Sequence, residues 1–548
     1  MGVTYDQPTI HRISARLRKI IQESFQKHLY TTAIFYADKL FSLSPDVEDL
    51  YTLAECYFKN KEYHRVLHLL KKHGDIAGND DRLKLLAAQS LMERKDWDEC
   101  LRYIDENAVA EGSRDEKMAS VFALLKGKVY ELTENQENAL IWYEKAVQLD
   151  PYCHEALDRL IGNHLLTLEK EVSLLRSLKL HEEDEWLRHM YAAKIAATNS
   201  DSPMDPESGR EREASQKPWC KGRHRRLKQA TVGEAFANNE YPVPYLPSAL
   251  VHNGQTLTAQ STRYFSEGDY ESCYHTSKKV LDEDPFHLAT WPVHIASLVM
   301  LDLKNAVFKS AHQLVNAYPT AAVSWFTAGC YYHMIKKYEH ARRFFHKALV
   351  LDHTFAPTWI AYGHAFAQHD ESDQALAQYR TASRLFPGSH LPWLFIGMEY
   401  VRTSSLQLAQ QYLENSRTLM PADPHVYNEL GVVAFFHKNY SKACDILLHA
   451  LSLSSTPHET FCTNLGHAFL KCKVYDRALE YFQQAYRLSP NSSALSGIAF
   501  TLHCTGRIEE AIEYYHRALS MQHDDVFATE ILKFAVQEAA EQPMSMEL

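Results

Sequence analysis

The sequence predicts an all-α protein, a right-handed superhelical solenoid of about 13 helix-turn-helix repeats. Three observations support this fold class. Small residues recur with a period of 34, hydrophobic residues make up 45% of the chain, and only 19 Gly and 20 Pro occur among its 548 residues. A turn-rich β fold needs more Gly and Pro, and one hydrophobic core rarely serves so long a chain.

The repeat is clearest in the second half of the sequence. Small residues separated by 12 and then 7 positions return every 34 or 35 residues, at Gly329, Ala341 and Ala348; Gly363, Ala375 and Ala382; Gly397, Ala409 and Ser416; Gly431, Ala443 and Ala450; and Gly466, Ala478 and Ala485. This is the signature of the tetratricopeptide repeat, a pair of antiparallel helices that cross at small residues. One repeat cannot bury its apolar face alone, so neighbouring repeats must stack.

The register divides the chain into five segments. We expect an N-terminal segment at 1–13, a first repeat array at 14–195, a polar and basic linker at 196–253, a second array at 254–535 and a tail at 536–548. Repeats of the second array begin near residues 254, 288, 322, 356, 390, 424, 459 and 492.

The linker breaks the period and is rich in charge and proline. Ser202 precedes Pro203 there, which makes it a candidate phosphorylation site. The basic residues between Lys217 and Lys228 fit either a nuclear-import or acidic-partner segment or, preferably, an ordinary solvated linker.

Several classes of function are disfavoured. The sequence lacks the HExxH, GxSxG, P-loop and GxGxxG motifs, so we expect no enzyme activity and no cofactor. His64 and His68 lie four residues apart without a third ligand nearby, so we predict no metal site. The net charge of −11 does not favour nucleic acid as a partner, and no apolar run is long enough to span a membrane.

Residues at the fifth and ninth repeat positions face the concave surface of such a solenoid and indicate its ligand. Chaperone-binding repeats place Lys and Asn there to hold a terminal carboxylate, whereas this chain has pairs such as Ile360 with His364 and Asn428 with Val432. A mixed apolar and polar lining suits an amphipathic peptide instead.

Segments beyond the generic repeat carry a closer resemblance. DPFHLATWPVHIASLVML, WIAYGHAFA, HLPWLFIGMEY and NELGVVAF resemble the subunit 6 family of the anaphase-promoting complex (cyclosome), the cell division cycle 16 homologues. The likeness extends over roughly residues 14–535 and is most specific in the second half.

The resemblance implies a non-catalytic scaffold of a cell-cycle ubiquitin ligase, found in the nucleus and cytoplasm. It also implies a homodimer formed by the N-terminal repeats, contacts with sister repeat subunits, and a small accessory subunit enclosed by the C-terminal repeats. The residues expected in that partner-peptide groove are Phe326, His333, His364, Arg402, Asn428, Phe435, Asn464 and His467. The alternative is another repeat adaptor that binds peptide segments, of the co-chaperone or transport type.

Overall fold

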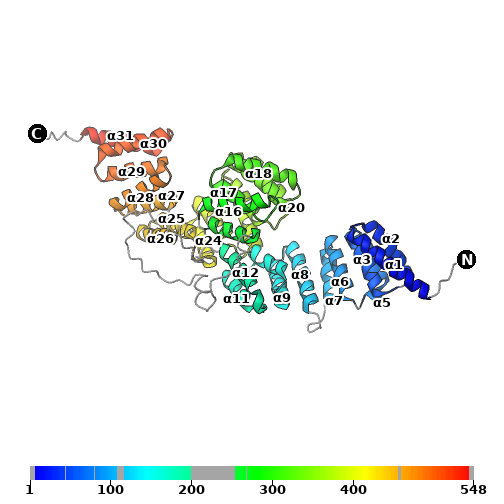
Figure 1. Cartoon of the computed structure of the whole chain (residues 1–548). Coiled ribbons are helices and arrows are strands. Elements are labelled where there is room, and N and C mark those ends of the chain that lie inside the picture. Colours follow the sequence, from blue (N-terminus) through cyan, green and yellow to red (C-terminus); the bar gives the residue numbers. More distant parts are fainter. Residues whose placement is uncertain are drawn as a thin grey trace. The chain divides into compact units, whose positions relative to one another are not determined.

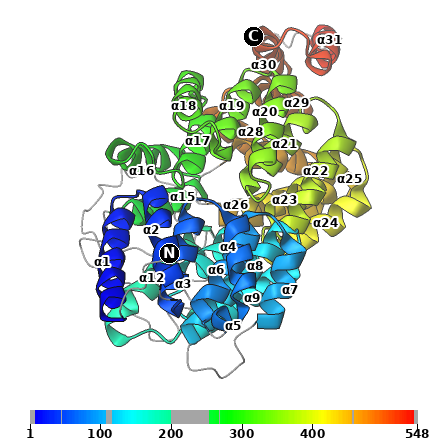
Figure 2. The ribbon, with the colours of Figure 1, turned by 90° about the vertical axis from the view of Figure 1, so that its right-hand side faces the viewer.

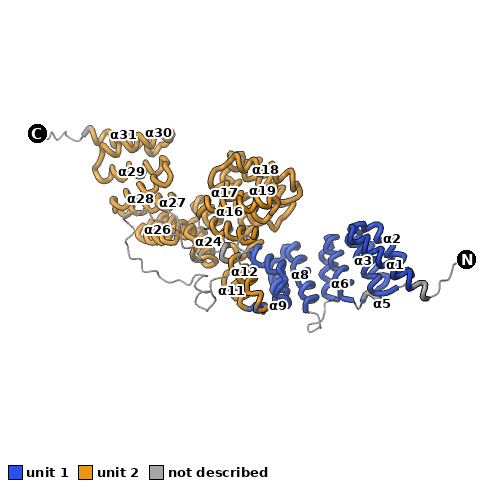
Figure 3. The backbone as a smooth tube through the Cα atoms, viewed as in Figure 1, with its two compact units in different colours: residues 1–165, 177–180 blue, residues 166–176, 181–548 orange. Residues whose placement is uncertain are grey.

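The computed structural model describes residues 7–43, 45–78, 80–107, 116–198, 253–266, 268–454 and 458–541. These residues form helices joined by short turns, and the chain folds into two compact units (Figures 1 and 3). Unit 1 comprises residues 1–165 and 177–180, and unit 2 comprises residues 166–176 and 181–548.

Unit 1 is a row of antiparallel helix pairs. Its helices are α1 (Gln7–Gln26), α2 (Tyr30–Leu43), α3 (Val47–Lys59), α4 (Tyr63–Lys72), α5 (Gly74–Ala77), α6 (Asp81–Glu93), α7 (Trp97–Asn107), α8 (Glu116–Leu132), α9 (Gln136–Leu149) and α10 (His154–Gly162). Helices that follow one another pack together, as α1 does with α2 and α8 with α9.

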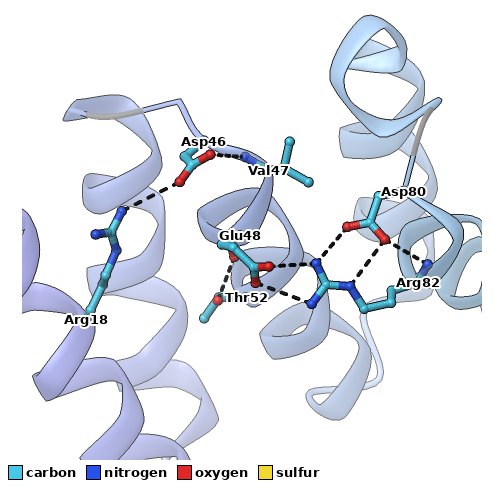
Figure 4. Close-up of polar contacts among 7 residues, drawn as sticks. All are labelled: Arg18, Asp46, Val47, Glu48, Thr52, Asp80 and Arg82. Carbon is cyan, nitrogen blue, oxygen red and sulfur yellow. Dashed lines mark hydrogen bonds and ion pairs between the residues drawn. The ribbon is translucent and has the colours of Figure 1, made fainter.

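Polar side chains link neighbouring pairs of unit 1 (Figure 4). Arg82 at the start of α6 reaches Glu48 Oε1 of α3 at 2.7 Å and also Asp80 at 2.8 Å. Arg18 of α1 makes a two-pronged bond to the buried Asp49 carboxylate of α3, with N–O distances of 2.9 and 2.8 Å. Such paired contacts restrict the relative orientation of successive repeats.

Unit 2 continues the same architecture. Its elements are α11 (Leu168–Ser177, whose last residue belongs to unit 1), η1 (Glu182–Asp184), α12 (Glu185–Thr198), α15 (Gly254–Ser266), α16 (Tyr270–Glu283), α17 (Trp291–Met300), α18 (Lys304–Ala317), α19 (Ala322–Met334), α20 (Tyr338–Leu351), α21 (Ala356–Ala367), α22 (Ser372–Leu385), α23 (Leu391–Arg402), α24 (Leu406–Leu419), α25 (Pro424–Phe436), α26 (Tyr440–Leu453), α27 (Glu459–Lys471), α28 (Tyr475–Leu488), α29 (Ser492–Cys504), α30 (Ile508–Met521) and α31 (Val526–Glu541). The predicted tetratricopeptide fold is confirmed, and Figure 2 shows the successive pairs from a second direction.

The small anchor residues lie where the two helices of a repeat touch. A Cβ atom added to Gly363 of α21 would come within 2.2 Å of Tyr379 Cε1 on α22, and one added to Gly329 within 2.4 Å of Phe345 Cε1. Two carbon atoms cannot approach so closely, so glycine permits the helix pair to pack around the buried ring. The small residues recur every 34 positions because each repeat needs this close contact between its two helices.

The turns inside the repeats share one backbone feature. In unit 2, a residue with positive φ follows the first helix of each pair, at Gly268, Asp302, Lys336, Asp370, Ser404, Lys438, Lys473 and Gly506. At Ser404 the turn is closed by bonds from Ser404 N to Val401 O and from Ser405 N to Tyr400 O. This left-handed residue ends the first helix and reverses the chain.

Tryptophan side chains form hydrogen bonds to the turns between repeats. Trp325 Nε1 donates to Pro319 O at 2.8 Å, and Trp359 Nε1 donates to His353 O at 2.8 Å. Each indole thereby holds the start of a first helix to the carbonyl six residues earlier in the chain.

Candidate functional site

The predicted groove residues lie on the first helices of successive repeats in unit 2. Helix α19 contacts α21, α23 contacts α25, and α25 contacts α27. The eight residues are placed as follows: Phe326 and His333 on α19, His364 on α21, Arg402 on α23, Asn428 and Phe435 on α25, and Asn464 and His467 on α27. They all lie on first helices of repeats, and their local environments differ.

His364 is the centre of an aromatic cluster. Its Nδ1 atom lies 2.7 Å from the hydroxyl oxygen of Tyr379, and Phe395 of the next repeat packs edge-on against its ring at 4.4 Å. Burial lowers the pKa of His364 to about 4, and the nearby His333 also disfavours its positive charge. His364 is therefore neutral near pH 7, with one ring nitrogen able to donate and the other to accept.

His333 is the second neutral histidine of this region. Burial lowers its pKa, and its ring packs edge-on against Tyr338 at 5.5 Å. Its Nε2 atom is buried and has no hydrogen-bond partner among the described residues. A buried polar atom without a partner lowers stability.

Asn428 and Asn464 are joined to each other. Asn464 Nδ2 donates to Asn428 Oδ1 at 3.0 Å, and Asn428 Nδ2 donates to Glu429 Oε1 at 3.0 Å. Asn428 is only 5% exposed. Burial raises the pKa of Glu429, while the bond from Asn428 opposes that rise. The two amides and the carboxylate form a polar strip across two repeats.

The last two predicted residues are Phe435 on α25 and His467 on α27. The His467 ring packs edge-on against the buried Phe482 at 5.0 Å, and burial lowers the pKa of His467. Phe435 is partly buried and contacts the ring of Tyr440 at 5.4 Å.

Phe326 and Arg402 are engaged within the protein. Phe326 is 6% exposed and packs edge-on against Phe355 at 5.5 Å. It is therefore a core residue that supports α19 from within. Arg402 bonds to Asp370 at 2.7 Å, to Ser372 at 2.7 Å and to Glu399 at 2.8 Å. It ties its repeat to the preceding one and offers little free hydrogen-bonding capacity.

Two residues of this region were not among the predicted ones. Phe395 and Glu429 occupy the sixth repeat position, 34 residues apart, as neighbours of His364 and Asn428. The predicted residue Asn464 occupies the same position of its own repeat. Comparing residues at the sixth position across repeats would have identified both.

The arrangement favours binding over catalysis. It presents neutral imidazoles, amides and aromatic rings, which can bond to a peptide backbone and cover apolar side chains.

Within the described ranges, no three His, Cys, Asp or Glu side chains are grouped so as to hold a metal ion. No described helix combines the length and apolarity needed to cross a membrane. The candidate phosphorylation site Ser202 lies outside the described residues.

Family models match parts of the chain. Residues 26–107 match the model of anaphase-promoting complex, cyclosome, subunit 3, and residues 122–153, 460–492 and 492–523 match tetratricopeptide repeats.

Longer matches come from whole proteins. The chain is 37% identical to anaphase-promoting complex subunit 6 of Arabidopsis thaliana, covering 95% of this chain and 96% of that protein. It is 34% identical to the cell division cycle protein 16 homolog of Homo sapiens, covering 95% and 84%. A solved structure, the APC/C hetero-tetramer Cut9–Hcn1, is similar with a TM-score of 0.76 and 29% identity, covering 95% of this chain and 96% of that one.

Proposed function

Because the chain belongs to the subunit 6 family of the anaphase-promoting complex, we propose that it is a non-catalytic scaffold of that complex. The observation that carries this proposal is the 37% identity to a subunit 6 protein over nearly the whole of both chains. The described residues consist almost entirely of stacked helical repeats, an architecture used to hold other proteins.

The chain is a tetratricopeptide subunit of a cell-division complex and binds other subunits of it. Within this role, we infer that the protein occurs in the nucleus and cytoplasm and contacts sister repeat subunits there.

We propose further that the N-terminal repeats within 14–195 form a homodimer. Cut9–Hcn1 is a hetero-tetramer of two proteins, which fits two copies of each. Unit 1 of this chain also exposes large apolar side chains, with Phe35 59% and Ile141 55% exposed. A two-fold contact is the commonest way to bury such surface between identical chains.

The C-terminal repeats within 254–535 would enclose a small accessory subunit, with Hcn1 in the Cut9 complex as the analogous second protein. The residues proposed to line its path are His333, His364, Asn428, Phe435, Asn464 and His467. Phe326 would support them from within the core, and Arg402 would hold its repeat to the preceding one. The polar strip formed by Asn428, Glu429 and Asn464 supports this proposal, because amide groups can bond to the backbone of an extended or helical segment.

The experiment is affinity purification of the tagged full-length protein from mitotic cells, followed by identification of the recovered proteins. Sister repeat subunits together with cullin-like and RING-type subunits are the expected result. Recovery of chaperones or transport factors in their place would overturn the proposal. Light scattering of the purified full-length chain tests the homodimer separately. A monomer at micromolar concentration would overturn the homodimer and leave the scaffold role untouched.

A further inference from the structure

Two cysteine thiols meet at the boundary between neighbouring repeats. Cys444 lies on α26, the second helix of one repeat, and Cys472 follows α27, the first helix of the next. Their Sγ atoms are 3.8 Å apart. Both thiols are free, and both side chains belong to the apolar core of the C-terminal repeats.

The two thiols differ in access to solvent. Cys444 is 6% exposed, and burial together with the neighbouring Cys472 raises the pKa of Cys444 to about 12. Cys472 is partly exposed and lies in the turn between α27 and α28. Since the thiolate is the reactive form and Cys444 is held as the thiol, a solute in water would react first at Cys472.

We propose that Cys444 and Cys472 form a redox-sensitive dithiol, which closes to a disulfide after a peroxide oxidises Cys472. The Cys472 thiolate would attack one oxygen of hydrogen peroxide, giving a sulfenic acid and hydroxide. Cys444 sulfur would then displace the sulfenic oxygen, which leaves with the Cys444 proton as water. In sum, two thiols and one peroxide give one disulfide and two waters, a two-electron oxidation of the sulfurs.

The geometry allows this closure with a small movement. A disulfide has an S–S distance of about 2 Å, so the sulfur atoms must approach by roughly 1.8 Å. Cys472 is positioned to supply most of that movement, because it lies at the end of α27 and precedes Lys473, whose φ is 62° in the turn. Cys444 lies in the first half of α26, within a continuous helix.

The bond would close a loop across two repeats. Cys444 and Cys472 are 28 residues apart, and their repeats are the same two that Asn428 and Asn464 connect. A covalent link there would restrict the angle between these repeats. Oxidation would therefore stiffen the part of the solenoid that carries the polar strip.

The test uses the full-length protein with Cys504, which is exposed, replaced by Ser to remove a competing thiol. The protein is treated with hydrogen peroxide, its remaining thiols are blocked with N-ethylmaleimide, and the non-reduced peptides are analysed by mass spectrometry. A peptide pair joined through Cys444 and Cys472, the loss of two thiols per event and full reversal by dithiothreitol are expected.

Two variants separate the roles of the two thiols. In Cys444→Ala, dimedone should trap Cys472 as the sulfenic acid and the cross-link should vanish; in Cys472→Ala, Cys444 should stay reduced. Circular dichroism checks that each variant retains its helices. The dithiol would be refuted if Cys444 of the oxidised parent protein could still be alkylated after unfolding. Cys472 would then be found labelled by dimedone or bridged to another molecule. Unchanged hydrogen exchange across residues 424–490 after cross-linking would refute the stiffening.

Discussion

Asn464 donates a side-chain hydrogen bond to Asn428 over 3.0 Å, which connects the first helices of two successive repeats. The residues are 36 positions apart in the sequence, and Asn428 in turn donates to Glu429. Each amide thus holds its neighbour in one orientation. Replacing either residue would disturb both, so their effects on binding should not be independent.

The first prediction concerns partner binding. The double substitution of Asn428 and Asn464 by Ala should weaken binding of the accessory-subunit peptide by roughly 2 kcal/mol, about a 30-fold rise in Kd, because peptide polar groups lose their partners. Either single substitution should already cause most of this loss. Calorimetric titration of the peptide into the full-length protein measures the effect.

The matched control replaces Gln407 and Asn415, two exposed residues of α24. Changing both to Ala should leave Kd within twofold of the parent. Equal Kd values for the parent and the Asn428 and Asn464 double variant would place the peptide on another face of the repeats.

The second prediction concerns packing inside a repeat. Gly363→Ala should destabilise the protein by about 1–3 kcal/mol, because the new Cβ would lie 2.2 Å from Tyr379 Cε1 on a ring that is almost fully buried. Hydrogen exchange should accelerate mainly between residues 322 and 420, since stability in a solenoid depends on nearest neighbours. Gly162→Ala is the control, as nothing lies within 4 Å of its added Cβ. Equal acceleration along the whole chain would contradict nearest-neighbour coupling.

The third prediction concerns the left-handed turns. Ser404 has a φ of 60°, a region that costs a residue with a Cβ roughly 1–2 kcal/mol. Ser404→Gly should raise the free energy of unfolding by about 0.5–1 kcal/mol, the relief of strain exceeding the entropy that glycine adds to the unfolded chain. Gly506→Ala, at a φ of 80°, should lower it. Urea denaturation measures both, and a loss of stability in Ser404→Gly would show that the serine turn is unstrained.

The fourth prediction concerns pH. The pKa of His364 is lowered to about 4 in the folded protein, against an ordinary value of 6.5. Between these values the unfolded chain binds more protons at this site than the folded one. The stabilising effect of the neutral ring is thus fully present above about pH 6.5 and is lost as the pH falls towards 4.

His364→Phe should therefore reduce the slope of stability against pH in that window, by on the order of 1–3 kcal/mol across it. His346→Phe, at an exposed position of α20, should keep the parental slope. Denaturant titrations at several pH values provide the comparison. If His364→Phe kept the full slope, the acid sensitivity would come from other groups.

The sequence could predict much of the fold because the repeat depends on contacts that a pattern reveals. Gly363 and Tyr379 are 16 residues apart, and the small residue is required wherever a large ring crosses it. The left-handed turns were not predictable in the same way. Lys336 and Ser404 carry side chains that do not ordinarily signal positive φ, and the tertiary packing of the two helices imposes it.

The site was less predictable because a repeat position fixes where a side chain begins and not what it touches. Phe326 and Leu394 share the fifth position and both are buried, whereas Arg402 extends towards the preceding repeat to reach Asp370. The polar strip depends on one residue at the fifth position and one at the sixth in adjacent repeats. Reading each position separately could not reveal that pairing.

The ion pairs that link repeats also bear on how the chain is made. Arg82 reaches back 34 residues to Glu48, and Arg402 reaches back 32 residues to Asp370. A repeat leaving the ribosome therefore finds its polar partner already synthesised and folded one repeat earlier. Each completed pair of helices offers the next pair a surface to pack against, so the repeats can fold one after another during translation.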